Sequence, residues 1–538
     1  MKHHVLAAAL GLAVCTTAGA QPSLSSGLSL KLIGQHRTGV FDDGAAEIVA
    51  HDPRNQRLFA VNASAASVDV MDINDPANPT LIGTIDATAL GNSANSVAVH
   101  KGIVAVAIEA GDKQAPGVVA FYDATSLALL NSVEVGALPD MVTFTPNGRY
   151  LLVANEGEPD DAYAVDPEGS VSIVDLRYGV ANAQVRTAGF DAYNDMADEL
   201  RAKGVRIFGP GASVAQDLEP EYIAVSQDSR RAWVSLQEAN ALALIDIRRA
   251  KVIDILPLGT KDHSQAANAL DASNRDGAIN ITTWPVKGMY QPDAIASYCF
   301  RGRTYIVTGN EGDSRDYDGF SEEARVKDLV LDPVAFPDAA SLQEDENLGR
   351  LNITTTLGDN DGDGDYDELY SYGARSFSIR DARGRLVYDS GDDFERITAE
   401  VLPNDFNSNN DENGSFDSRS DDKGPEPEGV AVGRIGGRHY AFIGLERVGG
   451  IMVYDVTNPY RVSFVDYINN RDFSVDAQLP DDSTNPLVGD LGPEGLVFIA
   501  AKDSPSGKPL LAVGNEVSGT TSVYEIDVER RRRGGHAH

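Results

Sequence analysis

The sequence predicts an all-β fold: a seven-bladed β-propeller closed by its N-terminal strand, with long loop insertions on one face. Two observations predict it. A hairpin pattern with a polar, mostly acidic residue at each end occurs seven times along the chain. Most copies are followed by one or two further segments of alternating apolar residues. Four antiparallel strands in a repeat of roughly 45 residues are typical of a propeller blade.

The clearest hairpin spans residues 427–446. Glu428 opens an alternating strand, Gly436 and Gly437 reverse the chain, and Glu446 ends the return strand. Alternation between turn residues is the usual signature of paired strands. We call the residue that opens the first strand, here Glu428, the opening position, and the residue that ends the return strand, here Glu446, the closing position. The opening positions are Glu47, Ser96, Asp140, Glu221, Asp293, Glu428 and Glu494, and the closing positions are Asn62, Glu109, Glu156, Glu238, Glu311, Glu446 and Glu516.

The two ends of the repeat region complement each other. The last copy ends at Val528 without a fourth strand, whereas residues 28–34 resemble the fourth strand at 80–85. We therefore expect the N-terminal strand to complete the last blade, which removes two exposed sheet edges. The alternatives are a solenoid or separate sandwiches. The expected domain is 21–529, with insertions at about 177–218, 261–290, 312–373, 398–425 and 471–492.

Composition and the chain ends bear on location and partners. Residues 1–20 read as a secretory signal with cleavage after Ala20, and 530–538 as a basic disordered tail. We expect a secreted or periplasmic protein. The formal charge of −36 argues against nucleic acid and anionic membranes and favours divalent cations as partners. No run after the signal is long enough to span a bilayer.

One loop has the pattern of a calcium site. Residues 359–367 read D-N-D-G-D-G-D-Y-D, so oxygen ligands recur at alternate positions and glycine permits a sharp turn. Hard oxygens in a flexible loop suit Ca²⁺. Residue Tyr370 stands where an EF-hand needs glutamate, so a hairpin-loop site is expected instead. The alternative is a merely acidic turn. The predicted calcium ligands are Asp359, Asp361, Asp363, Asp365 and Asp367.

The repeated acids suggest a second metal site. In a propeller, the opening and closing positions lie on one face, around the mouth of the central channel. Like charges crowded there repel unless a cation neutralises them. The alternative is a solvated acidic rim. The candidate ligands of this second divalent metal are Glu221, Asp293, Glu311, Glu428, Glu446 and Glu494.

Basic residues near these acids raise the question of catalysis. Arg315 and Arg375 lie beside these acids, and arginine can bind phosphate through two parallel hydrogen bonds. With a metal near Glu428 they would suit phosphoester hydrolysis by metal-activated water. The alternative is that each arginine pairs with neighbouring acids. The chain has no P-loop, G-x-S-x-G or HExxH motif.

Four segments resemble the choice-of-anchor I family, whose bacterial members are often labelled alkaline phosphatase-like, and the related mesenchyme-specific cell-surface glycoproteins of biomineralising animals. The segments are 310–317, 358–379, 417–429 and 444–450. The resemblance implies a secreted or surface propeller that binds calcium. No apolar anchor follows Val528, so we expect a soluble product.

Two functions remain open from the sequence. The first is a calcium-stabilised propeller that binds a metal and an extracellular ligand on its acidic face. The second is a metal-dependent phosphomonoesterase or phosphodiesterase that uses the same face. The acidic excess favours the first, because anionic substrates would be repelled without bound cations.

Overall fold

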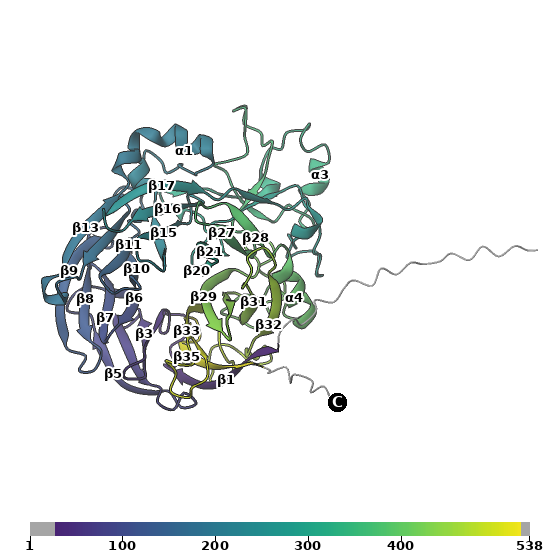
Figure 1. Cartoon of the computed structure of the whole chain (residues 1–538). Helices are drawn as coiled ribbons and strands as arrows, with labels where there is room; N and C mark the ends of the chain where they lie inside the picture. Colours follow the sequence, from purple (N-terminus) through teal and green to yellow (C-terminus); the bar gives the residue numbers. More distant parts are fainter. Residues whose placement is uncertain (1–26, 529–538) are drawn as a thin grey trace, which may run out of the picture.

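The computed structural model describes residues 27–528, in which sheets are arranged around a common centre (Figure 1). Within that range seven antiparallel sheets have four strands each. The predicted all-β class and propeller fold are confirmed. The predicted signal segment 1–20 and tail 530–538 lie outside the described residues.

The sheets follow one another along the chain. The first three comprise β2 (Val49–Asp52), β3 (Arg57–Asn62), β4 (Ser67–Asp72) and β5 (Thr80–Asp86); β6 (Ser93–His100), β7 (Ile103–Glu109), β8 (Pro116–Asp123) and β9 (Leu129–Ala137); and β10 (Pro139–Phe144), β11 (Tyr150–Asn155), β12 (Ser170–Asp175) and β13 (Gln184–Gly189). The next three comprise β14 (Pro220–Val225), β15 (Arg231–Leu236), β16 (Ala241–Asp246) and β17 (Lys251–Pro257); β20 (Ile295–Phe300), β21 (Arg303–Asn310), β27 (Ser376–Asp381) and β28 (Leu386–Asp389); and β29 (Pro427–Ile435), β30 (Arg438–Leu445), β31 (Ile451–Asp455) and β32 (Ser463–Ile468).

The seventh sheet joins the two ends of the described chain. It contains β33 (Pro493–Ile499), β34 (Leu510–Asn515), β35 (Thr520–Val528) and β1 (Leu28–Arg37). β1 pairs antiparallel with β35, and the register runs from Leu28 opposite Val528 to Arg37 opposite Thr520. The similarity between residues 28–34 and the other fourth strands is the local reason, since β1 takes the same place in its sheet.

The core lies between neighbouring sheets. All six residues of each of the strands β11, β12 and β34 are buried, which explains the nearly continuous apolar sequences of β11 and β34. Aromatic side chains link adjacent sheets: the Phe442 ring lies 6.0 Å from that of Phe498, and Phe377 lies 4.7 Å from Tyr454. Apolar burial of this kind contributes about 25 cal/mol per Å² and holds the sheets face to face.

The insertions add a small sheet and short helices. A five-stranded sheet contains β18 (Thr260–Asp262), β19 (Lys287–Met289), β26 (Tyr370–Ser371), β25 (Asn352–Thr354) and β24 (Glu323–Arg325), and a separate pair contains β22 (Asp316–Tyr317) and β23 (Phe320–Ser321). The α-helices are α1 (Ala197–Lys203), α2 (Val214–Asp217), α3 (Ala339–Leu342) and α4 (Asp393–Val401), and the 3-10 helices are η1 (Val180–Asn182), η2 (Asp191–Met196), η3 (Ala266–Asn268) and η4 (Val326–Asp328).

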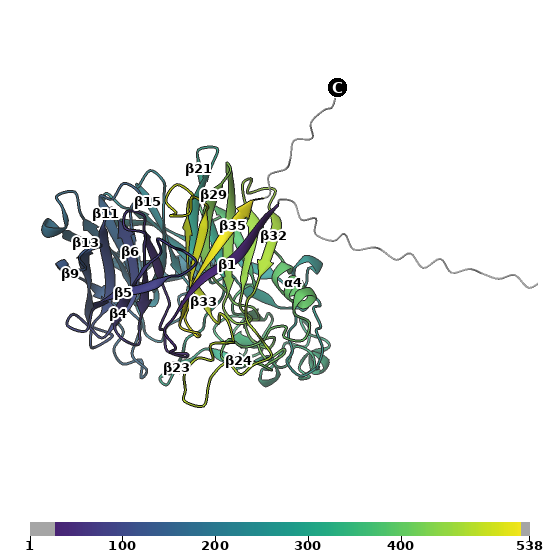
Figure 2. The same ribbon diagram turned by 90° about the horizontal axis from the view of Figure 1, so that it is seen from below.

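These additions are not spread evenly over the molecule. In Figure 2, β23 and β24 lie at one end of the blade strands, whereas the β21 hairpin reaches the other end. One predicted insertion needs correction. Within 177–218, residues Gln184–Gly189 form β13, the fourth strand of its sheet. The excursion proper therefore begins after Gly189.

Candidate metal centre

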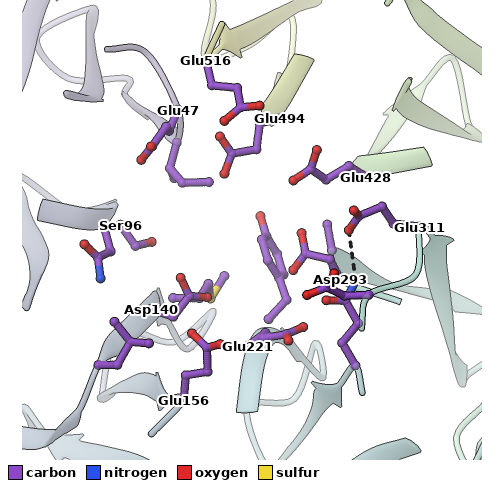
Figure 3. A pocket seen from close by; sticks show the side chains of 18 of the residues that line it. Glu47, Ser96, Asp140, Glu156, Glu221, Asp293, Glu311, Glu428, Glu494 and Glu516 are labelled. Atoms are coloured by element: carbon purple, nitrogen blue, oxygen red, sulfur yellow. Dashed lines mark hydrogen bonds between the residues drawn. The ribbon is translucent and has the colours of Figure 1, made fainter. Parts of the chain in front are cut away.

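A cavity of about 550 Å³ lies where the first strands begin and the second strands end (Figure 3). All seven opening positions line it. Six of the seven closing positions line it as well, and Asn62 is the exception. The structure therefore brings together the candidate metal ligands Glu221, Asp293, Glu311, Glu428, Glu446 and Glu494.

A local backbone device turns the opening side chains toward the cavity. In four copies the proline at the start of the strand pairs with the neighbouring strand, and the register then shifts across the next two residues. Asp140, Glu221, Glu428 and Glu494 each lie in such a bulge. A bulge bends the strand and re-aims a side chain. In these four sheets the bulge coincides with a Pro-Asp or Pro-Glu pair in the sequence.

Glycine next to the acid allows neighbouring sheets to approach closely. A Cβ atom on Gly429 would collide with the carbonyl oxygen of Glu494, and one on Gly495 would meet that of Glu47. Backbones of adjacent sheets thus touch beside the cavity. The acids beside these contacts, Glu428, Glu494 and Glu47, therefore come close together although they are far apart in sequence.

Burial and mutual repulsion perturb these carboxylates. Burial first, and neighbouring carboxylates second, raise the pKa of Glu47 to about 8 and hold the pKa of Glu494 well above its usual range. Burial also raises the pKa of Glu516 to about 7. Four carboxylate oxygens, the Oε2 atoms of Glu221, Glu238, Glu428 and Glu494, are buried without a hydrogen-bond partner in residues 27–528. Such oxygens are costly unless a ligand or ion satisfies them.

The acids form three tight groups. In each group, one oxygen from every carboxylate lies within 4.8 Å of the others. We call them the first, second and third groups: Glu47, Glu494 and Glu516; Asp293, Glu311 and Glu428; and Glu311, Glu426 and Glu446.

The third group is already neutralised by side chains. Glu426 is fully buried and forms three ion pairs. Its carboxylate oxygens lie 2.6 Å from Arg419 Nη2, 3.0 Å from Lys423 Nζ and 3.0 Å from Arg447 Nε. Burial alone would raise the pKa of Glu426, but these three cations outweigh it and hold the pKa well below its usual range. Arg447 also reaches Glu446 at 3.1 Å. Positive charge is thus supplied at this side of the cavity by the protein.

The first group has less compensation, because Arg447 lowers the pKa of Glu516 but is not among the neighbours that shift the pKa of Glu47 or Glu494 most. After burial, the four neighbours that shift the pKa of Glu494 most are all carboxylates, and each of them raises it. Glu47 likewise has only carboxylates, Glu516 and Asp140, among the neighbours that shift its pKa. The second group is intermediate, because Lys423 lies 2.8 Å from Glu311 while Glu428 keeps a bare oxygen. The first and second groups could hold a divalent cation.

The two predicted catalytic arginines do not line the cavity. Arg315 is 1% exposed, pairs with Asp217 and lies 2.9 Å from Glu219 Oε2. Arg375 pairs with Glu395 and donates to the carbonyl oxygens of Asp271, Ser420 and Asp422. These positions do not fit the role predicted for them on a bound phosphoryl group. The alternative, ion pairing with neighbouring acids, describes both.

Some cavity residues were not among the sequence candidates. Glu47 and Glu516 complete the first group, and both carried the signal of the repeat. Lys423 and Glu426 precede the opening position of their sheet, and nothing in the repeat marks them. Glu426 has φ of +49°, a left-handed conformation that turns its carboxylate toward three cations.

The predicted calcium loop has acids at close range. One oxygen each from Asp359, Asp361 and Asp367 lies within 4.8 Å of the others, and the same holds for Asp332, Asp365 and Asp367. Asp363 belongs to neither group. The backbone N–H groups of Gly362 and Gly364 donate to Asp359 at 2.7 and 3.1 Å. Asp332, from another part of the insertion, was not foreseen from the loop motif.

Similarity to known proteins now gives the family. A model of the choice-of-anchor I domain matches residues 47–459. The chain belongs to the choice-of-anchor I domain family. This confirms the resemblance read from the sequence, and the matched segment includes most of the residues that line the cavity.

This choice-of-anchor I chain is similar in sequence to two animal proteins. Gigasin-3a of Magallana gigas is 34% identical over 191 residues, which are 35% of this chain and 67% of that protein. The mesenchyme-specific cell surface glycoprotein of Strongylocentrotus purpuratus is 27% identical over 392 residues, which are 63% of this chain and 48% of that protein. The match to the second relative thus spans about half of its length.

Solved structures of similar shape include two propeller domains. The β-propeller domain of Myceliophteria thermophila Cps50 (Swd1) aligns with 92% of this chain at 10% identity and a TM-score of 0.45. The WD40 domain of Toxoplasma gondii coronin aligns with 95% at 10% identity and a TM-score of 0.46. Within residues 27–528, none of the helices combines the length and apolar character needed to cross a membrane.

Proposed function

We propose that this choice-of-anchor I protein is an extracellular β-propeller that binds divalent cations, calcium above all, in its central cavity. The observation that carries the proposal is the set of four buried carboxylate oxygens that have no hydrogen-bond partner in the part of the chain that the structure describes. In the proposed architecture residues 21–529 form one seven-bladed domain, and the pairing of β1 with β35 closes the ring.

The oxygen chemistry favours calcium. The first and second groups offer only carboxylates, without a histidine or cysteine. Calcium takes six to eight oxygen ligands in adaptable geometry, whereas zinc prefers nitrogen and sulfur. One cation at Glu47, Glu494 and Glu516, and one at Asp293 and Glu428, would remove the repulsion that raises the pKa values of these acids. The third group needs no metal.

Loop 359–367 is proposed as a separate, structural calcium site. Its carboxylates converge from both halves of the loop and from Asp332. Calcium there would fix the connection between β25 and β26, which belong to the inserted sheet. This site is proposed to stabilise the insertion and not to bind the extracellular ligand.

The proposed location rests on the named relatives. One of them is called a cell surface glycoprotein, and the sequence of residues 1–20 reads as a secretory signal. Extracellular fluid supplies calcium at a concentration that weak carboxylate sites can use. A secreted or periplasmic protein with an acidic cavity is consistent with both points.

Metal-dependent phosphoester hydrolysis is the second candidate, with less support. Three basic residues line the cavity, and each is already paired: Lys113 with Glu158, Lys423 with Glu311 and Glu426, and Arg447 with Glu426 and Glu446. A phosphoryl group would therefore have to bind through metal ions alone. Hydrolysis of phosphoester substrates in the presence of Ca²⁺, lost in Glu428→Gln, would establish this function.

The test of the proposal is a calcium titration of chelator-treated protein, with bound metal measured by mass spectrometry. The double variant Glu428→Gln, Glu494→Gln should bind about two calcium ions fewer than the wild type, because each group loses a charged ligand. Glu134→Gln, at an exposed position of β9, serves as the control and should keep the wild-type stoichiometry. Equal stoichiometry in the double variant would contradict the proposal.

A further inference from the structure

Two insertions meet beside helix α4, at residues that do not line the cavity. Glu395 of α4 joins them: its Oε2 accepts the backbone N–H of Asp271 at 3.0 Å, and its Oε1 accepts Asn407 Nδ2 at 3.1 Å. Asp271 belongs to the insertion after β18, and Asn407 belongs to the loop after α4. The only basic side chain paired with Glu395 in the described residues is Arg375.

Buried oxygens at this junction have no donor. Asp417 is 2% exposed; its Oδ1 accepts the Ser420 hydroxyl at 2.6 Å, whereas its Oδ2 is buried without a partner in the described chain. Asn407 is fully buried; its Nδ2 donates to the same Ser420 oxygen at 2.9 Å, and its Oδ1 is also without a partner there. Because both side chains bond to one hydroxyl, they are neighbours.

Each of the two insertions carries one further bare oxygen. Asn274 Oδ1 and Ser418 Oγ are buried atoms without a hydrogen-bond partner in residues 27–528. Four buried oxygens without a partner in two insertions that touch are unusual, because more than nine in ten buried polar groups in native structures are satisfied. All of them are oxygen atoms, so the missing partner is a donor of hydrogen bonds or a hard cation.

The local charge favours a cation. After burial, the charged neighbours that shift the pKa of Asp417 are three acids, Asp271, Asp276 and Glu395, and together they raise it to about 8. Burial and then the same Glu395 raise the pKa of Asp271 to about 7. Arg375 is already engaged with Glu395 and with backbone carbonyls. Within residues 27–528, no positive side chain forms an ion pair with Asp417, and none is among the largest influences on its pKa.

We propose that Asp417 Oδ2 and Asn407 Oδ1, with Asn274, Ser418 and Asp276 completing the set, bind a calcium ion. The ion would tie the loop after α4 to the insertion after β18. Carboxylate, amide and hydroxyl oxygens are ligands that Ca²⁺ takes readily. This site is distinct from the central cavity and from loop 359–367, and it does not depend on the function proposed for the cavity.

The test uses Asp417→Asn in the full chain. Asparagine has nearly the same shape and tolerates the left-handed φ of +67° at this position, so the change removes mainly the charge. The variant should bind one calcium ion fewer, and calcium should no longer protect the 402–420 loop from limited proteolysis. Glu412→Gln, exposed in the same loop, should keep both properties.

The outcomes separate this site from the other two. The site is supported if Asp417→Asn binds one calcium ion fewer and loses loop protection. Glu494→Gln and Asp361→Asn should in that case keep the protection of the loop. Unchanged stoichiometry and unchanged protection in Asp417→Asn would overturn it. If Asp417→Asn does not fold, wild-type crystals soaked in Tb³⁺ decide the question. An anomalous peak between Asp417 and Asn407 supports the site, and a water there overturns it.

Discussion

Replacement of Glu494 by glutamine should have opposite effects with and without calcium. Glu494 shares the first group with Glu47 and Glu516, whose oxygens lie within 4.8 Å of one another. In chelator, the variant should be more stable than the wild type, because it relieves repulsion. In calcium, it should be less stable than the wild type, because it removes a charged ligand. The two melting curves should therefore exchange order.

The magnitude follows from Coulomb's law and from proton uptake. Two unit charges at 4.8 Å cost about 3.5 kcal/mol at an effective dielectric constant of about 20, and Glu494 faces two such neighbours. Proton uptake limits the total. At pH 7.5, protonating a glutamate costs about 4 kcal/mol, at 1.36 kcal/mol per pKa unit. The charge removed in Glu494→Gln therefore stabilises the metal-free protein by about 2–4 kcal/mol.

The assay is thermal unfolding in EDTA and in excess calcium. With an unfolding entropy of about 2.1 cal/mol/K per residue over roughly 500 residues, Tm in EDTA should rise by about 2–4 °C. At a calcium concentration of 100 times Kd, the wild type gains about 2.7 kcal/mol per site, or about 3 °C, and the variant should lose that gain. Glu134→Gln should shift neither curve. A variant less stable than the wild type in EDTA would refute the reasoning, since Glu494 would then act as a structural partner and not as an uncompensated charge.

Three further outcomes are expected. In EDTA, the stability of the protein should fall as pH rises from about 4.5 to 8. The pKa of Glu47 is raised to about 8 and that of Glu516 to about 7, so the folded state holds protons that it loses over this range. A Tm that rises over this range would contradict the prediction. Excess calcium should flatten this pH profile. Arg315→Met should lower the free energy of unfolding by about 3–5 kcal/mol, since it leaves two buried carboxylates without their cation, while Arg230→Met at an exposed position should have little effect on denaturant midpoints. Asp361→Asn should reduce calcium binding by about one ion without changing the pH profile in EDTA, and an unchanged calcium titration would count against the loop site.

The repeat made much of the fold predictable. Carboxylates at both ends of a hairpin, followed by alternating apolar segments, located the first two strands of each sheet, and the cavity lining follows from the same positions. The predicted insertion at 177–218 was less accurate, because it includes a strand of the third sheet. There β13 has the sequence Gln184–Gly189, with little alternation and only one buried residue, so the period-two signal is faint.

Side-chain partners across long separations were less predictable. Arg315 lies near the acidic motif at 310–317 in sequence, yet its guanidinium points to Asp217, 98 residues away. Periodicity reports which face of a strand a residue occupies and not which distant loop covers it. The neutralisation of Glu426 by Lys423, Arg419 and Arg447 joins residues that are close in sequence, but the repeat does not indicate which acid each of these basic side chains contacts.

The pairing of β1 with β35 sets a condition on the order of assembly. β1 is made early on the ribosome, but its partner emerges much later, since Leu28 lies opposite Val528, 500 residues further along the chain. Contacts of such sequence separation form slowly. Until then β1 remains unpaired, and unpaired strand edges in partly folded chains are prone to aggregation. Glu494 lies in that last sheet and Glu516 in the turn between β34 and β35, so the acidic cavity can be completed only when synthesis is nearly over.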